Sequence, residues 1–322
     1  MQRILDPAQI EAFAQRAIPR LRLADPAVVF RKRAERLREL SEHHSVGEYL
    51  VLMAALCDGQ HRALATWDSM PSSGGDRTEA SARIARARAH DLPVLQALGW
   101  PRDSRWRLVL AELCNKLPND IPATVRGICD RLTSEDAACL EARADRVLGG
   151  NAQDLDMQAA PFVMAALQVY WVHLATSLGR AATQELEAAQ NHTGNAPLAG
   201  VCPVCGTLPL ASVVHADSPY QGYRYLHCAL CASEWHLVRI KCSHCLATEG
   251  IRYHYLQGGS EAIRAESCES CRTYRKILYQ EKDAAVEPVA DDLGSLALDL
   301  LMSAEQYHRA CGNPLLWQPL AG

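Results

Sequence analysis

The sequence predicts an α-helical N-terminal domain, two small β modules in tandem that are built around cysteine pairs, and a C-terminal helix. Three observations support this prediction. The first 190 residues show apolar positions at helical spacing, the following stretch alternates like short strands and holds four CxxC pairs, and the end begins with an amphipathic run. The expected boundaries are 1–190 for the helical domain, 191–200 for a linker, 201–240 and 241–283 for the modules, and 284–322 for the helix and tail.

The N-terminal region contains several segments with helical periodicity. They cover residues 46–67, 104–117, 134–148 and 160–189. The apolar run at 159–175 is shorter than the roughly 20 residues of a membrane span and includes Gln168 and His173, so we expect a buried core helix and no membrane insertion. An earlier helix carries a basic run broken by two glutamates, which predicts a solvated face, with a docking face for an acidic partner as the alternative. The run comprises Arg31, Lys32, Arg33, Arg36 and Arg38.

The cysteines give the sharpest signal in the chain. Eight of the thirteen form four CxxC pairs, and adding 40 to the numbers of the first two pairs yields the last two. Two tandem copies of one C-x2-C-x22-C-x2-C unit explain this offset, so the first two pairs should form one site and the last two another. A site made from the middle pairs would cut across the repeat. The two expected sets are Cys202, Cys205, Cys228 and Cys231, and Cys242, Cys245, Cys268 and Cys271.

Five cysteines lie outside the pairs, and we expect them to be buried thiols that act as small hydrophobic side chains. They are Cys57, Cys114, Cys129, Cys139 and Cys311. The N-terminal stretch MQRILDPAQIEAF lacks the apolar core of a secretory signal, so we expect a reducing compartment, the cytoplasm. Paired cysteines there are typical of metal or redox sites and not of a disulfide framework.

Four thiolates in a tetrahedron suit zinc or a single iron ion. Such a site is rubredoxin-like or zinc-ribbon-like, and it leaves no open position for hydrolytic catalysis. Thioredoxin-like chemistry needs one CxxC at the start of a helix, whereas the four pairs here lie among short predicted strands. The two-plus-two symmetry favours a mononuclear site over an iron–sulfur cluster. Gly206 after the first pair suits the backbone of a tight knuckle, whereas Leu246 in the equivalent place predicts a different solution for that turn.

Charge and motifs narrow the class of function. The formal net charge is −4, and residues 201–282 hold nine Lys/Arg against seven Asp/Glu, a balance that argues against nucleic-acid binding. Basic residues do interleave with aromatic ones in GYRYLH and TYRKILYQ, so stacking on bases stays an alternative. The sequence contains no phosphate-binding glycine loop, nucleophile elbow or HExxH motif, so we expect a protein that is not an enzyme.

The C-terminal stretch EPVADDLGSLALDLLMSAEQYHR predicts one amphipathic helix from Glu287 to Arg309, ended by Gly312 and Pro314.

Taken together, these segments resemble the FdhE family of formate dehydrogenase accessory proteins. The resemblance is carried by RAERLREL at 33–40, APFVMAALQVYW at 160–171, CPVCG at 202–206, RYLHCALCASEWHLVRIKCSHC at 224–245, AESCESCRTYRKILYQEKD at 265–283 and VADDLGSLALD after it. It extends over nearly the whole chain and retains all eight paired cysteines.

The resemblance implies a cytoplasmic maturation factor that assists respiratory formate dehydrogenases exported through the twin-arginine route. The expected partner is the catalytic subunit, which carries molybdopterin and an iron–sulfur cluster. The expected cofactors are two mononuclear metal ions, each held by four cysteines, with iron expected and zinc as the alternative. The alternative functions are a nucleic-acid-binding zinc ribbon and a rubredoxin-like electron-transfer protein. Residues beside the knuckles are our candidates for partner contact: Arg224, His227, Trp235, His236, Tyr274 and Lys276.

Overall fold

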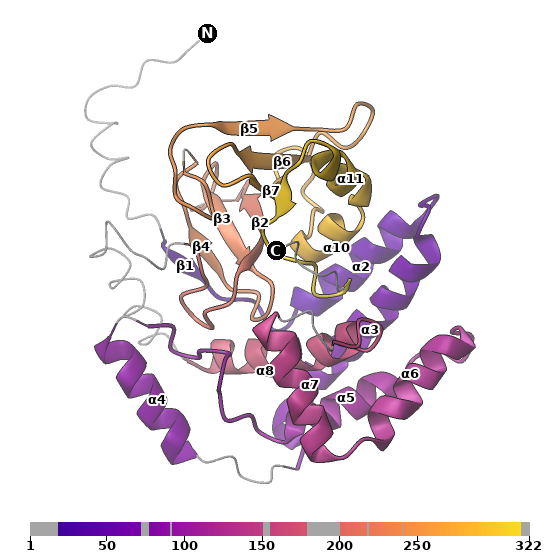
Figure 1. Ribbon diagram of the computed structural model, residues 1–322. Helices are drawn as coiled ribbons and strands as arrows, with labels where there is room; N and C mark the ends of the chain where they lie inside the picture. Colours follow the sequence, from indigo (N-terminus) through magenta and orange to yellow (C-terminus); the bar gives the residue numbers. More distant parts are fainter. Residues whose placement is uncertain are drawn as a thin grey trace.

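The computed structural model describes residues 19–71, 77–90, 92–150, 155–178, 200–217, 219–239 and 241–316. The N-terminal region is helical and the following region is rich in strands, as the sequence predicts (Figure 1). The helices are α2 (Val29–Ser41), α3 (Gly47–Ala65), the short 3-10 helix η1 (Trp67–Ser69), α4 (Arg77–Ala89), α5 (Arg105–Asn115), α6 (Ala123–Ser134), α7 (Ala137–Gly149), α8 (Ala160–Ser177), α10 (Pro288–Leu293) and α11 (Leu296–Ala304). The strands are β1 (Leu21–Arg22), β2 (Pro209–Val214), β3 (Arg224–Cys228), β4 (Glu234–His236), β5 (Ile251–His254), β6 (Ile263–Cys268), β7 (Thr273–Tyr279) and β8 (His308–Arg309).

Helix α8 forms the centre of the helical region, as its all-round apolar sequence predicts. Every residue from Ala160 to Val172 is buried, and α3, α5 and α7 pack around the helix. Its polar member Gln168 is satisfied inside the core, because Gln60 donates to its side-chain oxygen at 2.9 Å. Among the described residues, no helix is long and apolar enough to cross a membrane. The predicted continuation of this helix to residue 189 and the linker up to residue 199 lie outside the described residues.

The two cysteine repeats share one continuous sheet. Its strand order is β1-β4-β3-β2-β7-β6-β5, in which β2, β3 and β4 come from the first repeat and β5, β6 and β7 from the second. The repeats join where β2 runs parallel to β7, with Ser212 opposite Ile277 and Val214 opposite Tyr279. Neighbouring pairs within each repeat are antiparallel. The second repeat is therefore placed beside the first along the sheet, in the same orientation.

The sequence predicts one continuous C-terminal helix from Glu287 to Arg309, and this prediction is wrong in both length and continuity. The structure has two short helices, α10 and α11, and the chain then enters β8. The hydroxyl of Ser295 donates to the carbonyl of Asp291 at 2.6 Å, and the buried ammonium of Lys276 donates to the carbonyls of Asp292 and Ser295 at 2.7 and 3.1 Å. These contacts take carbonyl groups that a continuous helix would use, so the helix breaks between Leu293 and Leu296.

Part of the basic run on α2 is buried, which corrects the prediction of a solvated face. Arg31 is exposed and pairs with a residue of its own helix, as expected. In contrast, Arg33 is buried against Glu287 at 3.0 Å, and Arg36 is buried against Asp291 at 2.7 Å. The acidic partner of this helix is thus α10 of the same chain, and these pairs attach the C-terminal segment to the helical domain.

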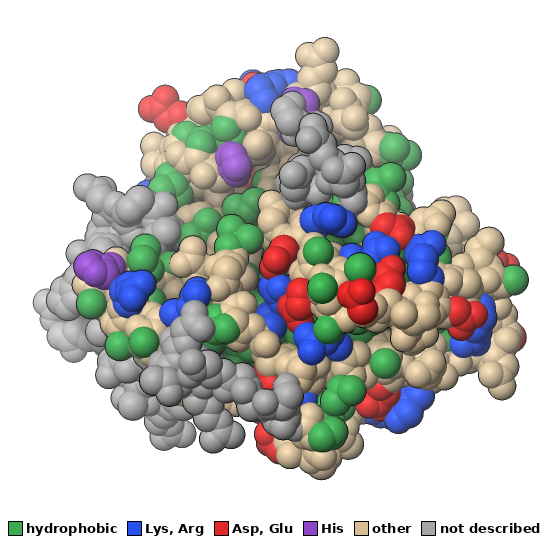
Figure 2. All heavy atoms as spheres, turned by 60° about the horizontal axis from the view of Figure 1, so that its bottom comes forward, with side chains coloured by type: hydrophobic (Ala, Val, Ile, Leu, Met, Phe, Trp, Pro, Cys, Tyr) green, Lys and Arg blue, Asp and Glu red, His purple; other side chains and the backbone are tan. Residues whose placement is uncertain are grey.

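The outer face of the helical region carries charges of both signs. Figure 2 shows acidic and basic side chains interleaved over the side that lies at the bottom of Figure 1. The ion pairs between the segment before α5 and helix α7 are examples: Arg102 contacts Glu141 and Asp145, both at 2.7 Å. On the described part of this face, such alternation does not form a single-sign patch that would attract a polyanion.

The cysteines outside the CxxC pairs follow the prediction in part. Cys57, Cys114 and Cys129 are buried as expected. The prediction is wrong for Cys139, which is exposed, and for Cys311, which is half-buried. Cys139 lies in the first turn of α7, where its amide donates to the capping carboxylate of Asp136 at 2.8 Å, and this turn faces solvent.

Candidate metal centres

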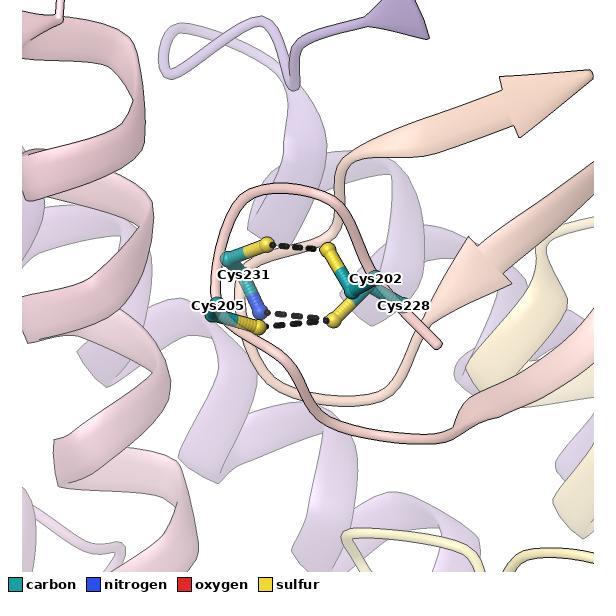
Figure 3. A group of neighbouring side chains, drawn as sticks. All are labelled: Cys202, Cys205, Cys228 and Cys231. Atoms are coloured by element: carbon teal, nitrogen blue, oxygen red, sulfur yellow. Dashed lines mark hydrogen bonds between the residues drawn. The ribbon is translucent and has the colours of Figure 1, made fainter. Parts of the chain in front are cut away.

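The eight paired cysteines gather into two clusters of four sulfur atoms. Within each cluster all sulfurs lie within 4.8 Å of one another. The clusters are the two sets that the 40-residue repeat predicts, and a cluster of the two middle pairs is not formed. Figure 3 shows the first cluster, which combines the pair before β2 with the pair that begins at the last residue of β3; Cys205 and Cys231 lie opposite Cys202 and Cys228. The closest sulfur pairs are Cys205–Cys228 at 3.4 Å and Cys202–Cys231 at 3.6 Å in the first cluster, and Cys245–Cys268 at 3.7 Å and Cys242–Cys271 at 3.8 Å in the second.

One backbone device builds all four knuckles. The residue after the second cysteine of each pair has a positive φ, and at three of the four knuckles its amide donates to the carbonyl of the first cysteine. The prediction that Leu246 needs a different turn is therefore wrong: it adopts the same left-handed conformation with φ 64°, and its amide donates to Cys242 at 3.1 Å. The other three residues are Gly206 (φ 76°), Ala232 (φ 54°) and Arg272 (φ 54°). Three knuckles thus tolerate a strained non-glycine residue, which costs about 1–2 kcal/mol each.

Backbone amides and hydroxyl groups surround the sulfurs. The amides of Leu230 and Cys231 point at the Cys228 sulfur from 3.4 Å, and those of His244 and Cys245 point at the Cys242 sulfur from 3.4 and 3.5 Å. Such donors favour the thiolate form.

The hydroxyl contacts are functional candidates that our sequence reasoning missed. Thr207 lies 3.1 Å from two sulfurs of the first cluster, Ser233 lies 3.2 Å from the Cys231 sulfur, and Thr273 lies 3.0 Å from the Cys271 sulfur. The signal was present in the sequence, because a Ser or Thr stands two residues after the second cysteine in three of the four pairs, and Ala247 takes that place in the other.

The donor sets fit a divalent or trivalent ion. For a metal–sulfur bond of about 2.3 Å, the edge of a regular tetrahedron is about 3.8 Å, close to the distances in the second cluster and slightly longer than those in the first. Burial raises the pKa of the Cys202 and Cys231 thiols well above the ordinary value. Burial has the same tendency at Cys228, but hydrogen bonds from the neighbouring thiols and from Thr207 lower its pKa well below the ordinary value. Burial disfavours the charged form of a thiol, so four thiolates in this pocket require a cation.

The first cluster is enclosed by the helical domain. The segment between α4 and α5 pairs with its knuckle, since the amide of Leu95 donates to the carbonyl of Val204 at 2.8 Å and the amide of Ala97 to that of Cys205 at 2.9 Å. From α8, the side-chain amide of Gln168 donates to the carbonyl of Ala229 at 2.7 Å. All four cysteines of this cluster are buried. A metal ion bound here would therefore be linked to the packing of the helices.

The second cluster is partly open. Cys245 is exposed and Cys271 is half-buried, whereas Cys242 and Cys268 are buried. On its inner side lies Arg275, whose Nε donates to the hydroxyl of Ser243, next to Cys242, at 2.8 Å.

Without a metal centre, the surroundings of Arg275 hold more buried positive than negative charge. Both terminal nitrogens of Arg275 are buried without a hydrogen-bond partner. The neighbouring carboxylate of Glu266 is already engaged by Arg224 at 2.9 Å. A metal–tetrathiolate centre carries net negative charge and would balance the extra buried cation, so these residues fit such a centre.

The residues proposed for partner contact are mostly engaged inside the protein. Tyr274 and Lys276 both bond to Asp299, at 2.8 and 2.7 Å. His236 is half-buried, and burial together with the charge of Arg20 lowers its pKa to about 4. The buried members of the set are Arg224, His227, Trp235, Tyr274 and Lys276. Their burial argues against direct contact with a partner.

Comparison with known proteins places every described region in one family. Three family models match: FdhE, N-terminal, over residues 18–188; FdhE, central domain, over residues 201–239; and FdhE, C-terminal domain, over residues 240–316. The chain is 38% identical over 319 residues to a protein FdhE homolog of Cronobacter sakazakii, covering 98% of this chain and 97% of that protein. It is also 38% identical over 301 residues to a homolog from Yersinia pestis, covering 93% and 92%. The crystal structure of the FdhE protein from Pseudomonas aeruginosa superposes with a TM-score of 0.77 at 32% identity, covering 92% of this chain and 99% of that one.

Proposed function

Because this chain belongs to the FdhE family, we propose that it is a non-catalytic maturation factor for a respiratory formate dehydrogenase. In this proposal it acts in the cytoplasm, binds the catalytic subunit before export, and carries an iron ion in each tetracysteine cluster. The observation that carries the proposal is the pair of four-sulfur clusters in a chain that matches the family from end to end.

The chemistry of the clusters supports a binding role and not hydrolysis. Four sulfur ligands satisfy a tetrahedral ion completely, so no position remains for a water molecule or a substrate. The eight paired cysteines would be the metal ligands. What the ions would supply is a stable fold in the first centre and, with iron, a charge that changes by one unit on oxidation.

The distribution of charge disfavours the nucleic-acid alternative further. Three of the nine cationic side chains between residues 201 and 282 are buried in the protein: Arg224, Arg275 and Lys276. They are unable to contact phosphate groups, and the remaining surface has nearly balanced charge.

The two centres differ in their surroundings, which suggests different roles. The first is enclosed by α8 and the segment before α5, so we propose that it holds the helical and strand regions together. The second presents Cys245 at the surface, so we propose that it lies near the bound subunit.

The decisive experiment is affinity purification of the tagged protein from its host under anaerobic conditions. Mass spectrometry of the retained proteins and metal analysis are made on the same sample. We expect a formate dehydrogenase catalytic subunit and about two iron ions per chain. Repeated purification without that subunit would refute the maturation role, and colourless protein with zinc alone would refute the iron assignment.

Paired substitutions separate the roles of the two centres. Cys202→Ser with Cys205→Ser should lower the unfolding temperature and expose the helical core to proteolysis, because the first centre is packed against it. Cys242→Ser with Cys245→Ser should remove one metal ion, leave the helical core protected and weaken retention of the subunit. Equal damage to the helical core by both pairs would contradict this division.

A further inference from the structure

Strand β5 forms an open edge of the sheet. It is the last strand in the order and pairs with β6 alone among the described strands. Figure 1 shows it at the outer end of the sheet, away from the helical region. Tyr253 in this strand is 42% exposed and the following Tyr255 is 68% exposed. An edge strand with unpaired backbone groups is a template for another strand.

The internal repeat shows what this edge accepts. Ser212 of β2 pairs with Leu226, and Tyr253 of β5 pairs with Glu266, which stands 40 residues after Leu226. Tyr253 therefore occupies in the second repeat the position that Ser212 occupies in the first. The outer side of β2 at Ser212 is filled by Ile277 of β7, in parallel orientation. The same edge is thus occupied in one repeat and open in the other.

The free backbone groups of β5 point to the side of the strand that this pairing requires. The amide of Glu269 donates to the carbonyl of Gly250 at 2.9 Å, so Gly250 faces β6. Backbone groups alternate between the two sides of an antiparallel strand. The backbone N–H and C=O groups of Arg252 and His254 therefore also face β6, whereas those of Ile251 and Tyr253 point outward. In β2 the carbonyl of Val214 accepts from Gln280 beyond the end of β7 at 3.0 Å, and Ser212 shares that side of the strand. Matching positions therefore face outward in both repeats.

A second copy of this chain does not offer a free strand that would complete the edge in the parallel manner of β7. The complementary edge lies at β4, which corresponds to β7 in the repeat. In the described structure, β1 covers that edge: Leu21 pairs with Trp235 and Arg22 with Glu234. Head-to-tail addition of copies, which would not close on itself, is blocked in this way. We therefore assign the edge at β5 to a segment of another protein.

We propose that the edge of β5 binds an extended segment of the client subunit as an added parallel strand with apolar or aromatic side chains, like Ile277 to Tyr279 of β7. This inference rests on the proposed function and adds the contact surface and the conformation of the bound segment. Backbone hydrogen bonds would supply affinity, and Tyr253 and Tyr255 would pack against the side chains of the segment. Ile251 lies opposite Cys268, so the added strand would run beside the second metal centre.

The test uses the metal-loaded full-length protein and a co-produced, purified formate dehydrogenase catalytic subunit. Tyr253→Pro removes an outward amide and the hydroxyl contact with Glu266 but leaves the backbone bonds to β6 intact, so it should weaken binding about tenfold or more. The matched control Tyr253→Phe keeps the amide and the ring and should bind within about twofold of the natural protein. Leu300→Lys, at an exposed position of α11, is a control for surface changes away from the edge. Metal content and unfolding temperature verify that each variant is folded.

Hydrogen exchange of the unaltered protein gives a second measurement that does not depend on the folding of a variant. The amides of Ile251 and Tyr253 should exchange quickly in the free protein and at least about tenfold more slowly in the complex, while those of Arg252 and His254 are slow in both. A bound subunit without added protection at Ile251 and Tyr253 overturns this inference and leaves the maturation role standing. Failure of the natural protein to bind the subunit overturns both. Protection that appears on self-association without the subunit assigns the edge to a second copy and overturns the occupant proposed here.

Discussion

Replacing Arg36 by Met should destabilise the protein strongly, although the sequence places this residue in a charged run. Its side chain is 7% exposed, and its guanidinium donates three hydrogen bonds to the fully buried carboxylate of Asp291. The nitrogen–oxygen distances lie between 2.7 and 3.1 Å. A further contact reaches Asp283 at 2.7 Å. Removal of the cation leaves a buried carboxylate without its partner, and loss of one member of such a pair costs about 3–5 kcal/mol. We therefore expect the free energy of unfolding to fall by that amount.

Urea unfolding followed by tryptophan fluorescence measures this change. Arg38→Met is the matched control on the same helix, because Arg38 is 49% exposed and its contact with Asp58 lies at the surface, where an ion pair contributes less than about 1 kcal/mol. Adding Asp291→Asn to Arg36→Met should recover part of the loss, since the remaining buried group is then neutral. A loss below about 1 kcal/mol for Arg36→Met, or the same loss for Arg38→Met, would refute the reasoning.

Three further predictions concern the centres and the response to pH. Thr207→Val removes a hydroxyl from two sulfurs and should lower metal affinity about tenfold, measured by competition with a chelator; unchanged affinity would contradict a supporting role. Gly206→Ala places a side chain at φ 76° and 3.3 Å from Pro93, so it should cost about 1–2 kcal/mol in urea unfolding. Leu246→Gly relieves the strain at φ 64° but removes a partly buried side chain that packs on the core, so it should cost less than Gly206→Ala; the reverse order would be incompatible with the shared turn. The folded-state pKa of His236 is about 4, below the ordinary value of 6.5, so its contribution to stability is present above pH 6.5 and is lost as the pH falls from 6.5 to 4. His236→Gln should flatten the fall of unfolding free energy in that interval, and parallel curves would exclude this origin.

The grouping of the cysteines could be predicted because it depends on local and repeated structure. A CxxC turn brings two sulfurs together by its own backbone geometry, and the 40-residue period indicates which turns belong to one unit. The apolar sequence of α8 likewise predicts its buried position, since a helix that is hydrophobic on every side must lie in a core.

Errors arose where distant segments decide the outcome. The sequence predicts a solvated face for Arg33 and Arg36, because their partners Glu287 and Asp291 lie more than 250 residues away in sequence. The C-terminal helix was predicted as continuous because its periodicity is good, but Lys276 of β7 takes two of its carbonyl groups. The turn at Leu246 shows a smaller error of the same kind, because the surrounding knuckle outweighs the preference of the residue for negative φ.

By itself, the sequence determined the helical and strand-rich regions, the two sets of four cysteines and the family to which the chain belongs, because these follow from periodicity, local turns and similarity along the chain. The tertiary structure alone decided that the two repeats join through parallel β2 and β7, that the first centre is enclosed and the second is partly open, and that β5 pairs with β6 alone among the described strands. The physical reason is that strand pairing and burial are set by contacts between segments far apart in sequence, and no local pattern specifies which edge is filled.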